Sequence, residues 1–378
     1  MSLRAYIGAD IFDGTALISG QALLLDGQQS KGVIAPGAIP SDCELFSLDG
    51  GTLMPGFVDL QVNGGGGVMF NDETTPQGVA KIAQAHASTG TSALLPTLIT
   101  DTQDKSKAAI DAVEAAVEQG VPGILGIHLE GPHLSIARKG AHDPALIRPM
   151  DDADEVFLCE AAQRLPNVMV TVAPENVTDA QIARLTAAGI IVSLGHTDCS
   201  FTEAESAFAA GARCVTHVFN AMSQMGNREP GLVGAALSTP GVAAGLIADN
   251  IHVHANSMRV ALAAKRASGD VFLVTDAMST VGSDITEFLL NGRKVLRNNG
   301  RLTLENGTLA GADLDFPRAI SVLLNEVGID PAEAFAMATA TPAAVLRDAK
   351  GFGKLSENGP ANMIYLNASH QFERFVTG

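Results

Sequence analysis

The sequence predicts an α/β protein, a closed (β/α)8 barrel that carries a small β-sandwich domain formed from both chain ends. Three observations over the 378 residues predict this fold class. Eight short apolar, β-branched runs alternate with Ala-rich helical stretches in the middle of the chain. Residues 1–54 hold short apolar runs bounded by Gly, Asp and Pro, without a helical period. A further strand-like run closes the chain.

Eight apolar runs are the expected barrel strands. They are Phe57–Val62, Ala93–Leu98, Ile124–Leu129, Val168–Ala173, Ile190–Leu194, Cys214–Phe219, Ala243–Ala248 and Val271–Thr275. Eight consecutive βα units favour closure into a barrel, while a doubly wound open sheet is the main structural alternative.

The helices between these strands end in glycines suited to a helix C-terminus. The clearest are expected over Thr75–Gly90, Thr178–Gly189 and Phe201–Ala212. Residues 287–311 place Asn-Gly pairs between strand-like runs, which predicts a hairpin insertion after the eighth strand. Helices then return at Pro317–Val327 and Pro331–Arg347.

We therefore expect two domains. Residues 1–54 and 345–378 form the small β-rich domain, and residues 55–344 form the barrel.

Charge and cysteine content exclude several classes of function. The chain has 41 acidic and 24 basic residues, a net charge of −17, which argues against general binding of nucleic acid or anionic membranes. The cysteines are Cys43, Cys159, Cys199 and Cys214. They lack CxxC spacing and are expected to be reduced thiols. No signal peptide or long apolar run is apparent, so a cytoplasmic protein is expected.

Polar residues follow the predicted strands at their C-terminal ends, where barrel enzymes carry their functional groups. They are Asp59, Gln61 and Asn63 after strand one, His128, Glu130 and His133 after strand three, His196 after strand five, His217 and Asn220 after strand six, Asp249 and His252 after strand seven, and Asp276 after strand eight.

One glutamate, two histidines and one aspartate thus face the same barrel mouth from four strands. Two neutral imidazoles and a carboxylate suit Zn²⁺ or Fe²⁺ with open positions, and a further carboxylate can carry a proton. A single strand-end His or Asp is more often a hydrogen-bonded loop or capping residue. Their alignment at one end of the barrel favours a metal site.

Other candidates have simpler explanations. His86 lies in a predicted helix and His370 in the C-terminal tail, and both are assigned to solvated surface. Asp59 is either a ligand or an organiser of its turn. The run Gly64–Gly67 lacks the Lys of a phosphate-binding P-loop, so we interpret it as a sharp bend or a close approach.

These residues lie in stretches that resemble the N-acetylglucosamine-6-phosphate deacetylases of the amidohydrolase superfamily. The stretches are MPGFVDLQVNGGGG, GIHLEGPHLSIARKGAHDP, LGHTDCS, THVFNAMSQMGNREPG, DNIHV and VTDAMS. They run in order from about Pro55 to Gly311, and the combination of HLEGP, THVFNAM and VTDAM is specific to this group.

The resemblance implies a role for each matched position. Glu130, His196 and His217 would bind the metal. Asp276 would be the general base toward metal-bound water and then the general acid toward the departing amine. His252 would contact the sugar and help to stabilise the transition state.

The resemblance also implies the positions that hold the substrate. Ala141 and His142 would position the acetamido group, and the segment containing Leu309, Ala310 and Gly311 would cover the substrate. Asn220, the Ala221 backbone and Arg228 would recognise the phosphate, with Arg228 reaching it within one chain or across a homodimer.

One departure from the wider superfamily bears on the metal count. Most amidohydrolases carry His-x-His after strand one, whereas this chain has Gln61 and Asn63. Neutral amides bind Zn²⁺ or Fe²⁺ weakly compared with imidazole. We expect one divalent metal per subunit, zinc or alternatively iron.

The predicted reaction is deacetylation of N-acetyl-D-glucosamine 6-phosphate to D-glucosamine 6-phosphate and acetate. Two alternatives remain: the same chemistry on another substrate such as N-acetylgalactosamine 6-phosphate, and a non-catalytic amidohydrolase-fold scaffold. Retention of the four metal-site and base residues argues against the scaffold.

Overall fold

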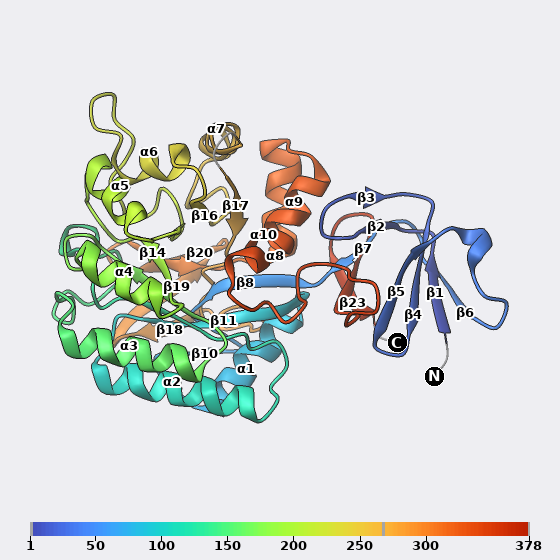
Figure 1. Cartoon of the computed structure of the whole chain (residues 1–378), viewed down its shortest axis with the longest axis horizontal. Coiled ribbons are helices and arrows are strands. Elements are labelled where there is room, and N and C mark those ends of the chain that lie inside the picture. Colours follow the sequence, from blue (N-terminus) through green and yellow to red (C-terminus); the bar gives the residue numbers. More distant parts are fainter. Residues whose placement is uncertain (1–2, 267–268, 377–378) are drawn as a thin grey trace.

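The computed structural model describes residues 3–266 and 269–376 and confirms the predicted fold class (Figure 1). Eight parallel strands form one sheet in the order β17-β16-β15-β14-β13-β12-β11-β8. They are β8 (Phe57–Val62), β11 (Thr91–Ile99), β12 (Ile127–Glu130), β13 (Val168–Val172), β14 (Ile191–Leu194), β15 (Cys214–Val215), β16 (Ala243–Leu246) and β17 (Val271–Leu273). The barrel closes where Val62 bridges Ala277 and the Asp276 N–H donates to the Gln61 carbonyl at 3.0 Å.

Every predicted run overlaps a barrel strand, and the bounds differ most at the third and the sixth strand. The third starts at Ile127 because Gly126 has φ +143°, which interrupts the extended backbone. The sixth, expected as Cys214–Phe219, has only two residues. Its chain turns away from the sheet because His217 and Phe219 have φ of +27° and +79°.

Helices surround the barrel, mostly between successive strands (Figure 1). They are α1 (Pro76–Ala87), α2 (Gln103–Glu118), α3 (Asp152–Arg164), α4 (Asp179–Ala187), α5 (Phe201–Ala209), α6 (Gly231–Ser238), α7 (Ala255–Lys265), α8 (Phe316–Val322), α9 (Pro331–Ala338) and α10 (Ala340–Val345), with short helical segments η1 (Pro36–Ala38), η2 (Ile136–Arg138) and η3 (Leu323–Val327). Capping boxes start α4 and α5, at Thr178 and Ser200. Among the described residues no helix is long and apolar enough to span a membrane.

The helix predicted over Pro331–Arg347 is in fact two helices, α9 and α10. The break is at Thr339, where φ and ψ are −134° and −84° and the hydroxyl donates to the Phe335 carbonyl at 2.7 Å. Pro342 lacks the N–H that a continuous helix would donate to the carbonyl of Ala338. The chain therefore bends between the two helices.

The two chain ends form a sandwich of two sheets beside the barrel, and Figure 1 shows both termini there. One sheet has the order β5-β4-β1-β6 and the other β23-β22-β7-β2-β3. The strands are β1 (Leu3–Ile7), β2 (Asp10–Phe12), β3 (Leu17–Ile18), β4 (Ala22–Asp26), β5 (Gln29–Ile34), β6 (Glu44–Ser47), β7 (Thr52–Pro55), β22 (Met363–Leu366) and β23 (Phe372–Val376). Tyr6, Leu23, Leu53 and Met363 belong to its separate apolar core.

The predicted hairpin insertion is a four-stranded antiparallel sheet over the barrel mouth. Its strands are β18 (Glu287–Leu290), β19 (Arg293–Asn298), β20 (Arg301–Leu304) and β21 (Leu309–Ala312). The first turn, Asn291-Gly292, has φ of +49° and +73°, as a type I′ turn requires. Leu290 and Val295 pack with Met278 from the end of the barrel.

A small hairpin of β9 (Gly64–Gly65) and β10 (Val68–Met69) contains the glycine run, and it makes a close approach. A Cβ on Gly64 would lie 2.4 Å from the carbonyl oxygen of Val68, so a side chain cannot be placed there. Gly66 and Gly67 have φ of +61° and +84° and make the bend.

His86 is buried beneath this hairpin, so its assignment to solvated surface is wrong. The side chain is 1% exposed, and Nε2 donates to the Gly64 carbonyl at 2.9 Å. Helix α1 buries Val79, Ile82, Ala83 and His86, a stripe with the i, i+3, i+4, i+7 spacing of one helix face. Burial lowers the pKa of His86 to about 4.

His370 is also not fully solvated. It is half-buried, and its ring lies 5.8 Å from the ring of Phe335 in α9. Burial lowers its pKa as well.

Candidate active site

A cavity of about 380 Å³ opens at the C-terminal ends of the barrel strands and contains most of the predicted site residues. Those that line it are Glu130, Ala141, His142, His196, His217, Asn220, Ala221, His252, Asp276, Leu309 and Gly311. Several of these side chains leave the strands in a backbone conformation that is rare for residues other than glycine. His196, Ala221 and Asp276 have φ of +49°, +49° and +50°.

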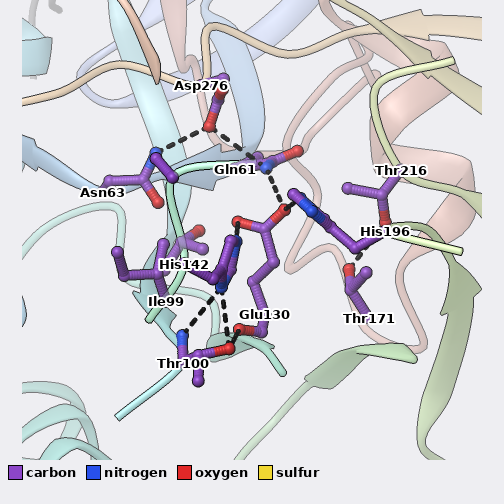
Figure 2. A network of polar contacts seen from close by, with 12 residues as sticks. Gln61, Asn63, Ile99, Thr100, Glu130, His142, Thr171, His196, Thr216 and Asp276 are labelled. Atoms are coloured by element: carbon purple, nitrogen blue, oxygen red, sulfur yellow. Dashed lines mark hydrogen bonds and ion pairs between the residues drawn. The ribbon is translucent and has the colours of Figure 1, made fainter. Parts of the chain in front are cut away.

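Glu130 lies at the centre of the polar network, between His142 and His196 in Figure 2. It ends β12 and is 2% exposed. Its Oε1 atom is 3.1 Å from Nε2 of His196 and 3.1 Å from Nε2 of His217. Burial raises the pKa of a carboxyl group, but the two histidines next to Oε1 outweigh it and hold the pKa of Glu130 well below its usual value.

A third histidine, His142, also approaches Glu130, with Nε2 4.0 Å from Oε2. Glu130, His142 and His196 each offer a ligand atom within 4.8 Å of the others. Distance alone therefore does not identify the metal ligands, and the hydrogen bonds on the far side of each ring must be considered.

The far-side hydrogen bonds distinguish His196 from His142. Nδ1 of His196 is 2.9 Å from the Arg138 carbonyl, which can only accept, so Nδ1 carries the proton and Nε2 offers a lone pair. Nδ1 of His142 instead lies 3.3 Å from the Thr100 backbone nitrogen and 2.8 Å from the Thr100 hydroxyl. As an acceptor from the backbone N–H, Nδ1 is unprotonated, which puts the proton on Nε2. Burial lowers the pKa of His142 to about 3, which keeps it neutral. This tautomer makes His142 a hydrogen-bond donor into the cavity, in keeping with the substrate-binding role expected from the sequence.

The arrangement of Glu130, His196 and His217 fits a divalent metal. The Nε2 lone pair of His196 faces a carboxylate oxygen at 3.1 Å, and two lone pairs this close need a positive charge between them. A proton or a shared cation meets that need. Two imidazoles and a carboxylate are the donors that zinc and ferrous iron prefer. These residues are the three ligands expected from the sequence.

Asp276 is held by two amide side chains from β8 and the residues after it. Nδ2 of Asn63 donates to Oδ1 at 2.7 Å, and Nε2 of Gln61 donates to the same oxygen at 3.2 Å (Figure 2). Gln61 also donates to Oε1 of Glu130 at 3.2 Å, so it links the two carboxylates. Burial, together with the negative charge of Glu130, raises the pKa of Asp276 to about 6.

Asp59 organises its turn and does not line the cavity. It is fully buried, its Oδ2 accepts from the Thr275 hydroxyl at 2.5 Å, and its Oδ1 accepts from the Gln61 N–H at 3.2 Å. The side chain thus ties the residues before Asp276 to β8, where the barrel closes. Burial raises the pKa of Asp59 to about 7.

His252 is oriented by Asp249, a partner to which the sequence assigned no role. Nδ1 of His252 is 2.7 Å from Oδ2 of Asp249, and the His252 N–H donates to Oδ1 at 2.8 Å. The contact fixes the proton on Nδ1 and leaves Nε2 for the cavity. Burial raises the pKa of a carboxyl group, but the bond from His252 brings the pKa of Asp249 below its usual value.

Two predicted substrate-binding positions lie outside the cavity lining. Ala310 is fully buried in the apolar cluster of the insertion, while Leu309 and Gly311 line the cavity. This follows from strand alternation, because neighbouring residues of β21 face opposite ways. Arg228 is exposed, in a loop outside the cavity lining of its own chain.

Two further histidines, His128 within β12 and His133 after it, have other roles. Both ring nitrogens of the fully buried His128 are used, by the Leu60 carbonyl at 2.9 Å and the Thr171 hydroxyl at 2.7 Å. His133 lines a separate cavity of about 440 Å³ that also contains Arg148 and Asp154. The larger cavity thus holds none of the predicted metal-site or base residues.

Comparisons with known proteins identify the family of this chain. The amidohydrolase family model matches residues 52–375. The chain is 44% identical over 324 residues to the N-acetylgalactosamine-6-phosphate deacetylase of Shewanella sp. (strain ANA-3), covering 85% of this chain and 81% of that protein. It is 32% identical over 371 residues to the N-acetylglucosamine-6-phosphate deacetylase of Haemophilus influenzae, covering 97% and 96%.

A solved structure matches over nearly the whole chain. The crystal structure of N-acetylglucosamine-6-phosphate deacetylase from Pasteurella multocida superposes with a TM-score of 0.93 at 31% identity, covering 99% of this chain and 98% of that one. The chain therefore belongs to the amidohydrolase family and is a hydrolase that acts on amide carbon–nitrogen bonds.

Proposed function

We propose that this enzyme hydrolyses the acetamide of N-acetyl-D-glucosamine 6-phosphate, giving D-glucosamine 6-phosphate and acetate. The observation that carries the proposal is that Glu130, His196, His217 and Asp276 line one cavity, together with Asn220 and Ala221. Water adds to the acetamide carbonyl, the C–N bond breaks, and the nitrogen leaves as an amine.

One divalent metal per chain, zinc or alternatively iron, would be held by Glu130, His196 and His217. It would supply Lewis acidity that activates water and polarises the acetamide oxygen. Gln61 and Asn63 point their N–H groups at carboxylates, so they serve as donors rather than as ligands for a second ion.

Asp276 moves the proton. The hydrogen bonds from Gln61 and Asn63 both go to Oδ1, which leaves Oδ2 to face the substrate in this proposal. Burial favours the protonated form of this carboxyl group, so it can accept a proton from the attacking water and return it to the leaving nitrogen. The fixed left-handed backbone aims this carboxylate toward the metal ligands.

The two cavity histidines outside the ligand set divide the substrate contacts between them. His142 presents a fixed Nε2–H, which suits the acetamide oxygen as negative charge develops on it. His252 has its proton on Nδ1, so in its neutral form Nε2 accepts from a sugar hydroxyl. Protonated His252 also donates, which would help to stabilise the transition state.

The phosphate is expected near Asn220 and the Ala221 backbone. Arg228 lies outside its own cavity lining, which supports a homodimer in which Arg228 of the partner subunit reaches the phosphate.

The galactosamine epimer is the second candidate substrate, because the Shewanella relative at 44% identity is an N-acetylgalactosamine-6-phosphate deacetylase. The test is acetate release by metal-replete enzyme from N-acetylglucosamine 6-phosphate, N-acetylgalactosamine 6-phosphate and unphosphorylated N-acetylglucosamine. We expect the highest kcat/KM on the phosphorylated glucosamine derivative. A higher value on the galactosamine epimer would establish the second candidate, and no acetate from either phosphate would reject both.

A further inference from the structure

We infer that Arg138 binds the substrate phosphate within its own chain, by exchanging its carboxylate partner Asp198 for the phosphate. This inference rests on the proposed function, because it assigns a new residue to the phosphate end of that substrate. Arg138 lies at the end of η2, in the loop between β12 and α3.

Arg138 is the one Lys or Arg among the described residues that line the cavity. The same lining contains the carboxylates of Glu130 and Asp276, within a chain of net charge −17. A phosphate dianion therefore needs a local cation to offset an unfavourable field. Within one chain, the cavity offers Arg138 for that purpose.

The position of the loop places Arg138 near the expected phosphate site. A Cβ on Gly140 would lie 3.9 Å from Cβ of Ala221 and 3.2 Å from Cε1 of His196, so this loop packs against the Ala221 end of the cavity. The loop is also fixed, because the Arg138 carbonyl bonds Nδ1 of His196. The backbone is thus anchored at the site while the side chain, 38% exposed, reaches the mouth.

The present partner of Arg138 resembles the proposed ligand. Nε and Nη2 both approach Oδ1 of Asp198 at 2.8 Å, and the Asp198 side chain is half exposed. An exposed ion pair of this kind is weak, whereas a guanidinium binds a phosphate through two parallel hydrogen bonds. A phosphate can therefore replace Asp198 as the acceptor of the Arg138 hydrogen bonds with little loss of free energy.

The neighbouring Lys139 provides a matched control. It has the same charge one residue away but does not line the cavity, and its Nζ lies 3.5 Å from the Gly140 carbonyl. If only the electrostatic field mattered, substitution of either residue would weaken phosphate binding equally. If Arg138 contacts the phosphate directly, only its substitution would weaken binding.

The experiment compares R138Q, K139Q and wild type by steady-state kinetics on the phosphorylated and the unphosphorylated N-acetyl amino sugar. We expect R138Q to raise KM for the phosphorylated substrate about tenfold or more, with kcat little changed. It should leave kcat/KM on the unphosphorylated sugar unchanged, and K139Q should match wild type on both. Equal effects of R138Q and K139Q, or an unchanged KM in R138Q, would overturn the inference.

The carboxylate partner gives a second, opposite test. D198N removes the competitor, so we expect a lower KM for the phosphorylated substrate, and no such effect in the R138Q background. A lower KM that persists in the double variant would contradict the exchange.

Binding of inorganic phosphate, measured by calorimetry, separates this inference from the proposed function because it requires no turnover. We expect weaker binding to R138Q than to K139Q, with equal metal content in both. If wild type binds phosphate through Arg138 but releases no acetate, the proposed function fails and the binding site stands. If wild type releases acetate and R138Q binds phosphate normally, only the Arg138 assignment fails.

Discussion

Three residues with the proposed central roles, His196, His217 and Asp276, have left-handed backbone conformations at the ends of barrel strands. Such conformations cost free energy in residues other than glycine and persist where the surrounding structure fixes them. Here the Arg138 carbonyl holds the ring of His196, and Asn63 and Gln61 hold Asp276. These sharp turns direct the three side chains into the cavity. In a strand that continued, the same side chains would point elsewhere.

The proposed proton transfer by Asp276 can be tested separately from metal binding. Asp276→Asn keeps the size of the side chain but cannot take a proton, so we expect kcat to fall roughly 10²–10⁴-fold. Metal content should stay at the wild-type value, because Asp276 is bonded to Asn63 and Gln61 rather than to the three ligands. Kinetics and metal analysis on the same preparation check both parts. Near-normal kcat in the variant would remove Asp276 from the mechanism.

At the scale of elements, the sequence predicts most helices and strands because their local signals agree with the final packing. Capped starts and terminal glycines mark α4 and α5, and Asn-Gly pairs mark the insertion. The predicted bounds are wrong where tertiary contacts override the local sequence pattern. The strand β15 ends early because the chain turns at His217, and one predicted helix divides at Thr339.

The contact between α1 and the glycine hairpin gives a prediction about pH. His86 has a pKa of about 4 in the fold against about 6.5 when unfolded, so the unfolded chain takes up the extra proton as the pH falls below 6.5. This lowers the free energy of unfolding, by about 2 kcal/mol at pH 5 relative to neutral pH.

His86→Gln keeps an N–H for the Gly64 carbonyl but does not titrate in this range. Urea unfolding at pH 7 and pH 5 should therefore show a smaller loss of stability on acidification in the variant than in wild type. The same loss in both proteins would mean that His86 is not buried in its neutral form.

For the whole molecule, the barrel explains why the site could be predicted at all. Parallel strands share one C-terminal end, so Glu130, His196, His217 and Asp276 meet in space although they are far apart in the chain. The contacts that orient the site residues from behind could not be predicted in this way. Asp249 behind His252 and Arg138 beside Asp198 depend on loop conformations, which strand periodicity does not encode.

The topology also separates the parts that form the cavity from the sandwich of the two chain ends. The sandwich of the two chain ends has its own apolar core, whereas the insertion packs against the barrel mouth and supplies Leu309 and Gly311 to the cavity. Arg293 of the insertion further bonds the Ala141 carbonyl, which joins the covering sheet to the loop that carries His142. The cavity is therefore built from the barrel and its insertion.

One divalent metal, held by Glu130, His196 and His217, is proposed to support amide hydrolysis. The most direct measurement is a titration of chelator-stripped enzyme with Zn²⁺, in which acetate release from N-acetylglucosamine 6-phosphate and bound metal are followed together. We predict no activity in the stripped enzyme and a linear rise that ends at one equivalent per chain. Activity that survives stripping, or that requires two equivalents, would contradict the account.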